Sequence, residues 1–100
     1  MTTKSSSKNF MFSKKMNADL LRQASNLGEA SATLARFLIA FGLKKKKPKK
    51  LKEDSTALTE PVSIRIPIPI WDIIAAKCEG RGEKAAYVRH LILKGLYDFF

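Results

Sequence analysis

Apolar residues alternate with other residues along the segment Val62-Ser63-Ile64-Arg65-Ile66-Pro67-Ile68. This period of two predicts a β-strand with one buried face. The inward positions are Val62, Ile64, Ile66 and Ile68. Pro67 and Pro69 cannot donate backbone hydrogen bonds, so the strand should stop near them, and Pro69 suits the first turn of a helix.

After this strand the apolar residues recur at the spacing of helices. The pattern predicts one helix from about Ile70 to Glu79, a break at Gly80-Arg81-Gly82, and a second helix from about Glu83 to Phe100. The inward positions are Ile70, Ile73, Ile74 and Cys78 in the first helix, and Val88, Leu91, Ile92, Leu96 and Phe99 in the second. The C-terminal part of the chain therefore has the predicted order strand, helix, helix.

The N-terminal part repeats this order. Phe10 and Phe12 alternate in a short predicted strand, and helices are predicted over Asn17 to Asn26 and Glu29 to Leu43, on either side of a break at Gly28. The inward positions are Leu20, Leu21, Ala24, Leu34, Phe37, Leu38 and Phe41.

An internal duplication is predicted from the match between the two parts. An offset of 53 residues superposes Arg36 on Arg89 and Gly42 on Gly95, together with apolar residues around them. The strands and the glycines between the helices fit only if one residue is gained or lost within each half.

The net charge of the chain then indicates which class of partner it binds. The 100 residues carry 19 Lys and Arg against 9 Asp and Glu, a net charge of +10, which makes nucleic acid or an anionic membrane surface the expected partner. Seven lysines crowd residues 44–52 around Pro48, and the polar run Glu53-Asp54-Ser55-Thr56 follows. Mutual repulsion and proline oppose regular structure, so residues 44–61 are predicted to link two units, residues 1–43 and 62–100. Each unit is too small to fold unaided, so the two should share one core.

Catalytic chemistry has no candidate residues in the sequence. Cys78 is the only cysteine, and His90 has no second ligand at metal-binding spacing, so neither a disulfide within the chain nor a zinc site is expected. No nucleophile and base pair or phosphate-binding glycine loop is visible. We expect a protein without cofactor, metal or enzymatic activity.

The polar segment Met1 to Asn9 predicts no signal peptide, and the apolar stretch Leu34 to Leu43 is too short to span a bilayer, so a cytoplasmic location is expected.

The C-terminal pattern resembles the ribbon-helix-helix family of the MetJ/Arc type. The resemblance rests on the strand Val62-Ser63-Ile64-Arg65-Ile66-Pro67, a short helix, a glycine-rich turn and a helix containing Ala86 to Ile92, and it extends more faintly to residues 8–43. It implies a mainly α fold with a short β-ribbon, in which two tandem units pair their strands over four helices as a pseudo-dimer within one chain. It also implies that the outward side chains of the ribbon read DNA bases in the major groove.

The resemblance assigns base contacts to the outward residues of both strands. With Ile64 and Ile66 buried, Ser63 and Arg65 face outward, and Arg65 can offer a bidentate fork to a guanine edge. In the other strand, burial of Phe10 and Phe12 would turn Asn9, Met11 and Ser13 outward; the opposite face would present Lys8 and Lys14 instead.

Contacts to the DNA backbone are expected from two sources. The start of the second helix in each unit is an anion site by its dipole and unpaired N–H groups, and Ser31 and Lys84 lie in these first turns. The lysine tract is expected to add contacts to phosphate by counterion release. Its candidate contacts are Lys44, Lys45, Lys46, Lys47, Lys49 and Lys50.

Tandem units in one chain look most like the TraY proteins of conjugative plasmids, which are relaxosome accessories at the transfer origin. This likeness implies double-stranded DNA as the partner, a relaxase or other relaxosome proteins as further partners, and a monomer that binds DNA in one or several copies. A transcriptional repressor or an antitoxin of the same family is the alternative, although antitoxins usually need an extended segment beyond the last helix. A weaker alternative is an anionic membrane-surface binder that places the helix Leu34 to Leu43 in the interface; its apolar face is needed for the core, so no membrane contact is expected.

Overall fold

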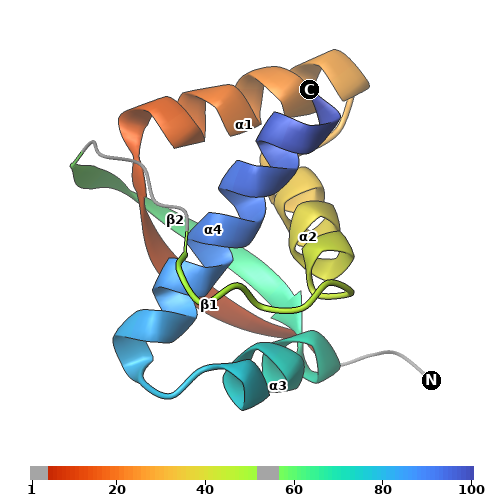
Figure 1. Cartoon of the computed structure of the whole chain (residues 1–100). Helices are drawn as coiled ribbons and strands as arrows, with labels where there is room; N and C mark the ends of the chain where they lie inside the picture. Colours follow the sequence, from red (N-terminus) through yellow and green to blue (C-terminus); the bar gives the residue numbers. More distant parts are fainter. Residues whose placement is uncertain (1–4, 52–56) are drawn as a thin grey trace.

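The computed structural model of the chain describes residues 5–51 and 57–100, with the side chain of Arg81 left aside. The elements run in the order β1 (Ser5–Ser13), α1 (Lys14–Leu27), α2 (Ser31–Gly42), β2 (Leu58–Pro67), α3 (Ile68–Lys77) and α4 (Arg81–Phe99) (Figure 1). The expectation of a mainly α fold with a short β-ribbon is confirmed.

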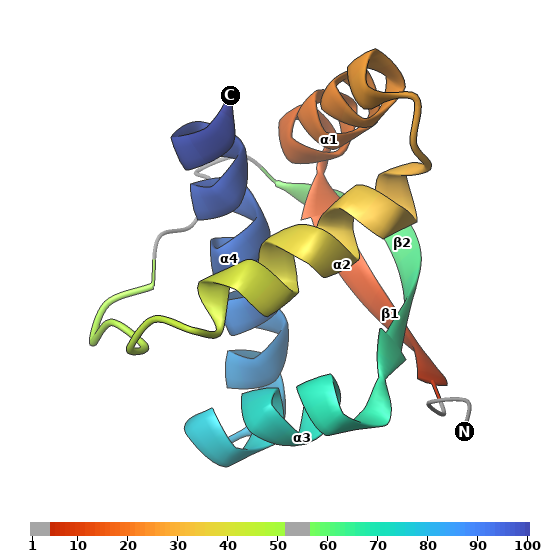
Figure 2. The same ribbon diagram turned by 90° about the vertical axis from the view of Figure 1, so that its right-hand side faces the viewer.

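The two strands form one antiparallel ribbon. Asn9 lies opposite Ser63 near its middle, and the register runs from Ser5 opposite Pro67 to Ser13 opposite Leu58, with an irregularity between Phe12 and Ser13. Strand residues alternate between two faces, so one face carries the buried Phe10, Phe12, Ile64 and Ile66. The helices lie against this face and leave the opposite face of the ribbon uncovered (Figure 2).

The buried side chains of both halves belong to a single core. It joins Phe12 and Leu20 from the first half to Ile64, Ile74 and Val88 from the second. Helices α2 and α4 cross each other (Figure 2), and each supplies buried leucines and isoleucines to this core.

Several of the predicted inward positions are confirmed by their burial. They are Leu20, Ala24, Leu34, Leu38, Ile64, Ile66, Ile74, Val88, Leu91, Ile92 and Leu96. Six others are wrong, because Leu21, Phe37, Phe41, Ile68, Ile73 and Phe99 are exposed. In these helices the apolar face is wider than the area that the ribbon and the neighbouring helices cover.

The element boundaries differ from the prediction where strands meet linker and helix. β2 begins at Leu58, inside the expected linker, and Pro61 takes its place in the strand opposite Met11. α3 begins at Ile68, immediately after Pro67, with Pro69 in its first turn as expected. Residues 52–56 of the expected linker lie outside the described residues. Within the described ranges, no helix combines the length and the apolar character needed to cross a membrane.

Candidate nucleic-acid interface

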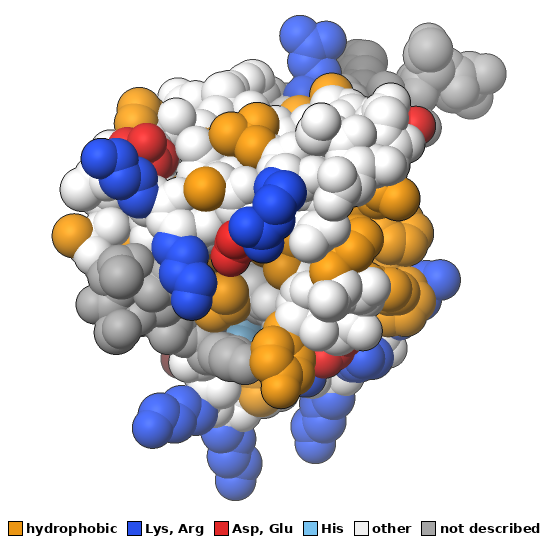
Figure 3. Space-filling model, turned by 90° about the horizontal axis from the view of Figure 1, so that it is seen from above, with side chains coloured by type: hydrophobic (Ala, Val, Ile, Leu, Met, Phe, Trp, Pro, Cys, Tyr) orange, Lys and Arg blue, Asp and Glu red, His pale blue; other side chains and the backbone are white. Residues whose placement is uncertain are grey.

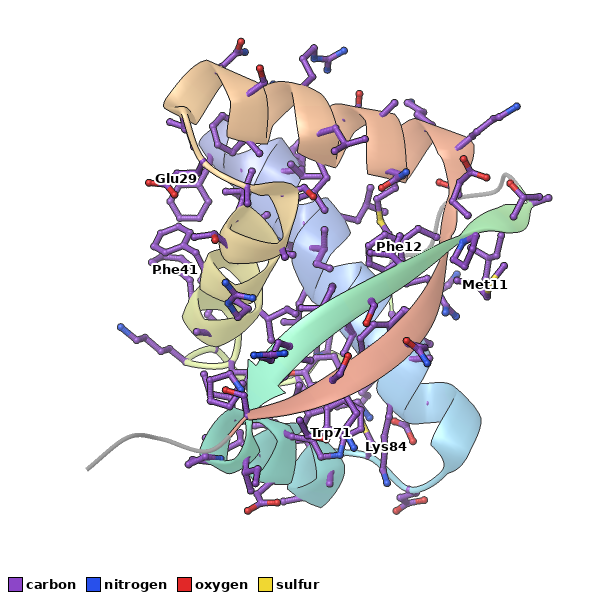
Figure 4. All side chains as sticks on the ribbon, turned by 180° about the vertical axis from the view of Figure 1, so that it is seen from behind. Met11, Phe12, Glu29, Phe41, Trp71 and Lys84 are labelled. Carbon is purple, nitrogen blue, oxygen red and sulfur yellow. The ribbon has the colours of Figure 1, made fainter. Side chains whose placement is uncertain are left out.

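The uncovered face of the ribbon presents a row of exposed side chains. From β1 these are Ser5, Ser7, Asn9 and Met11, and from β2 they are Pro61, Ser63 and Arg65. The predicted outward positions of Asn9, Met11, Ser63 and Arg65 are therefore confirmed, while their contact with bases stays a prediction. Figure 4 shows Met11 at the ribbon, with Phe12 and Trp71 on its helix side.

Two hydrogen bonds involve strand residues near the middle of the ribbon. Ser7 Oγ and Ser63 Oγ lie 2.8 Å apart across the ribbon. Arg65 lies opposite Ser7, and its backbone carbonyl accepts a hydrogen bond from Arg36 Nη1 at 3.4 Å. The exposed guanidinium of Arg65 thus stands at one end of the row and the Met11 side chain, 42% exposed, at the other.

Ser13 does not face outward, and that expectation is wrong. Its side chain is fully buried, and its hydroxyl accepts a hydrogen bond from the Met16 amide at 3.1 Å. Ser13 is the N-cap of α1, so it satisfies one of the N–H groups that a helix start leaves unpaired. The N-cap position breaks the strand alternation, because Phe12 and Ser13 are both buried.

Lys8 lies on the helix side of the ribbon. It is half-buried, and its Nζ lies 4.8 Å from the centre of the Trp71 ring, which itself packs against Phe10. The alternative orientation of β1, with Lys8 on the reading face, is therefore excluded. Lys14, exposed, is the first residue of α1.

The two helix starts that were expected to bind phosphate differ from each other. α2 has no acidic residue in its first turn and no side-chain cap at Ala30, and Ser31 is half-exposed there. In α4 the first turn carries Glu83, whose carboxylate accepts from the Glu79 amide at 2.9 Å and from Lys47 Nζ. The Glu83 carboxylate is itself an anion at the start of α4, beside the half-buried Lys84. Of the two helix starts, only that of α2 therefore remains a candidate phosphate site.

The lysine tract lies away from the reading face. In Figure 2 residues 44–51 and the ribbon are on opposite sides of the molecule, and the opposed views of Figures 1 and 4 agree. Lys77 Nζ holds the start of this segment by donating to the carbonyls of Leu43 and Lys45, at 2.9 and 3.3 Å. The structure thus separates the tract from the ribbon, contrary to the expectation that both face one duplex.

Two titratable side chains beside the tract have raised pKa values. Burial raises the pKa of the Cys78 thiol, against the opposing effect of Lys47 and Lys84. Burial, and then the neighbouring Cys78, raise the pKa of Tyr87, whose hydroxyl has no hydrogen-bond partner among the described residues. Both groups are therefore held in their neutral form and have no part in the reading face.

Sequence reasoning missed three of these features. The Ser13 cap had a signal, since a serine stood immediately before a helical pattern. The pairing of Glu83 with Lys47 and the contact of Arg36 with Arg65 had none, because their partners are 36 and 29 positions away in the chain. A comparison with family models, curated proteins and solved structures finds no match to this chain.

Proposed function

We propose that the chain binds double-stranded DNA by inserting the β1–β2 ribbon into the major groove. The observation that carries this proposal is the uncovered face of the ribbon, where Asn9, Ser63 and Arg65 present hydrogen-bonding groups outward. Buried residues of the opposite face hold both strands against the helices. The net charge of +10 favours a polyanionic partner.

The dimensions of the groove support this geometry. A B-DNA major groove is about 12 Å wide and admits a two-stranded ribbon, whose outward side chains then reach base edges. Arg65 can pair with the O6 and N7 of a guanine through its guanidinium, Asn9 can pair with an adenine, and the Met11 side chain suits a thymine methyl group. The start of α2 supplies backbone N–H groups for a phosphate.

The proposal includes two tandem ribbon-helix-helix units in one chain. The order strand, helix, helix occurs twice, and the two strands pair with each other rather than with a second chain. An offset of 54 residues relates Phe10 to Ile64 and Leu20 to Ile74, all buried, and relates Asn9 to Ser63, which face each other at the ribbon's middle. Pairing of equivalent positions is what a pseudo-two-fold axis through the ribbon requires.

The biological role proposed for this binding is that of a relaxosome accessory, by likeness to the TraY proteins. A repressor or antitoxin would use the same ribbon, so the position of the bound site distinguishes these roles. A footprint inside a transfer origin supports the accessory role, and one over a promoter supports repression.

To test which groove the protein occupies, bound sites are selected from random duplexes and then methylated. Dimethyl sulfate modifies guanine N7 in the major groove and adenine N3 in the minor groove. We expect interference from guanine methylation within the selected site. Interference from adenine methylation alone would place the protein in the minor groove and overturn the proposal, and failure to enrich any sequence would reduce it to charge-driven binding.

A further inference from the structure

Three exposed phenylalanines pack on one another between α2 and the C-terminal end of α4. The rings of Phe41 and Phe99 meet edge to face with centres 4.8 Å apart, and Phe37 lies 5.8 Å from Phe99 and 6.1 Å from Phe41. Phe37 is 53% exposed and Phe99 is 43% exposed. We call Phe37, Phe41 and Phe99 the aromatic ridge.

A hollow lies on each side of the aromatic ridge. One, of about 180 Å³, is lined by Leu38, Phe41, Leu91 and Phe99 among others. The second, of about 450 Å³, is lined by Leu27, Leu34, Phe37 and Phe100 among others. Figure 3 shows apolar side chains gathered on the flank where Figure 1 places α2. A contiguous exposed apolar surface of this kind marks an interaction site.

Basic side chains border the first hollow. Lys45, Lys46 and Lys94 line it, and Lys45 Nζ lies 5.5 Å from the centre of the Phe41 ring. Asp98 is the acidic residue on this lining, and it is paired with Lys94 at 3.4 Å. The first hollow therefore combines an apolar lining with a positive border, whereas the charged residue on the lining of the second hollow is Glu29.

We propose that the aromatic ridge and its two hollows bind an amphipathic, acidic segment of a partner protein. The apolar side chains of the segment fill the hollows, and its carboxylates meet Lys45 and Lys46. The surface adjoins the lysine tract, which lies on the opposite side from the ribbon, so the partner and a duplex can be bound together. This proposal goes beyond DNA binding and does not depend on it.

Two other occupants fit the surface less well. A second copy of this chain would bring the lysine-bordered surface toward another chain that also carries +10, so charge opposes this contact. An anionic membrane would suit the lysines and the exposed phenylalanines, but it offers no side chains of fixed shape to fill the two hollows.

The test uses helical synthetic peptides that share one apolar face. One carries glutamates on its polar face, a second carries lysines there, and a third keeps the glutamates but has serines on the apolar face. We expect the first to bind at least tenfold more tightly than the others. Amide shifts in the NMR spectrum of the protein should be confined to the two ranges that line the hollows, residues 27–48 and 87–100. Equal binding of the first and third peptides, or shifts on the ribbon, would overturn the proposal.

Variants of the protein locate the site. Phe99→Ser, and separately Lys45→Glu with Lys46→Glu, should weaken binding of the acidic peptide at least tenfold. The matched control is Tyr97→Ser, because Tyr97 is on the same helix, is 75% exposed and lines neither hollow. Binding to phosphatidylserine vesicles that Phe99→Ser abolishes, without peptide binding, would assign the surface to membranes instead. A stable dimer in sedimentation that Phe99→Ser dissolves would assign it to a second copy.

Discussion

Gly42 of α2 approaches Leu91 of α4 so closely that a Cβ atom on the glycine would lie 2.6 Å from Leu91 Cδ2. The reciprocal pair has nearly the same geometry, because a Cβ on Gly95 of α4 would lie 2.7 Å from Leu38 Cδ2 of α2. In each pair a leucine of one helix fills the space that the glycine of the other leaves open. The absence of two side chains therefore sets how closely α2 and α4 cross.

Gly95→Ala is expected to destabilise the protein by about 1–3 kcal/mol, as overpacking in a filled core does. Its new Cβ would also lie 3.1 Å from Leu38 Cβ, which rotation of the leucine cannot move. Gly42→Ala should cost less, because the next atom of Leu91 is 3.6 Å away and a rotamer change relieves the contact. The measurement is urea unfolding.

Gly82→Ala is the control for both glycine variants. Gly82 lies in the first turn of α4 with nothing within 4 Å of an added Cβ, and alanine is the better helix former, so no loss of stability is expected. If Gly95→Ala and Gly82→Ala unfold at the same urea concentration, α2 and α4 do not cross as closely as described.

Tyr87 should make stability depend on alkaline pH. Its pKa is raised in the folded protein above the ordinary value of 10.0, so its contribution to the free energy of unfolding is complete below pH 10 and is lost as pH rises through the raised pKa. Tyr87→Phe should remove this part of the decline above pH 10. At pH 7 it should leave stability unchanged or raise it by about 1 kcal/mol, because the buried hydroxyl has no partner among the described residues.

The matched variant for this measurement is Tyr97→Phe, since Tyr97 is 75% exposed. Its stability should change with pH in the alkaline range as that of the wild-type protein does. A Tyr87→Phe curve that keeps the wild-type slope would show that Tyr87 ionises as readily in the folded protein as in the unfolded one.

Arg65→Ala is expected to weaken binding to a selected DNA site by about 1–3 kcal/mol and to spare binding to random DNA, as loss of a bidentate guanine contact does. Arg22→Ala removes the same charge from the exposed surface of α1, where Arg22 pairs with Asp19 at 2.9 Å, and should change neither affinity by as much. Fluorescence anisotropy of the wild-type protein and both variants on both DNAs gives the four changes in affinity. Equal losses on selected and random DNA would mean that Arg65 contacts only phosphate.

The position of the lysine tract leads to a prediction about salt. Replacing Lys44, Lys46, Lys49 and Lys50 by glutamine should leave the slope of log affinity against log salt nearly unchanged, because the tract and the ribbon lie on opposite sides. Each phosphate contact that was lost would flatten the slope by about 0.9. A slope flatter by two or more would show that the duplex reaches the tract.

Periodicity predicted the ribbon and the four helices, because the alternation of Phe10 with Phe12 and of Ile64 with Ile66 belongs to neighbouring residues. It failed at Phe37 and Phe41, which share the helical spacing of the buried Leu34 and Leu38. Spacing shows that a face is apolar but not how much of it other elements will cover. That depends on how closely α2 and α4 cross, which the sequence pattern does not contain.

The sequence likewise predicted one part of the candidate site correctly and another part wrongly. Arg65 was predicted correctly as outward because its neighbours in the strand are buried. The lysine tract was expected beside the ribbon because charge composition identifies a polyanion partner without locating the charge in space. Its position follows from contacts such as that of Lys77 with the Leu43 carbonyl, between residues 34 positions apart.

The last prediction concerns the symmetry of the DNA site. Because β1 and β2 pair within one chain, the free protein should sediment as a monomer, and its site should lack the inverted repeat that a two-fold dimer selects. A half turn about the Asn9–Ser63 pair exchanges Arg65 with Met11, so one half of the site should contain a required guanine and the other an apolar contact such as a thymine methyl. Met11→Arg places a guanidinium at both ends, and Met11 is 42% exposed, so the variant should fold. Sites selected by Met11→Arg should therefore shift toward an inverted repeat with guanine in both halves. A wild-type protein that already selects a perfect inverted repeat, and sediments as a dimer, would show that the ribbon forms between chains.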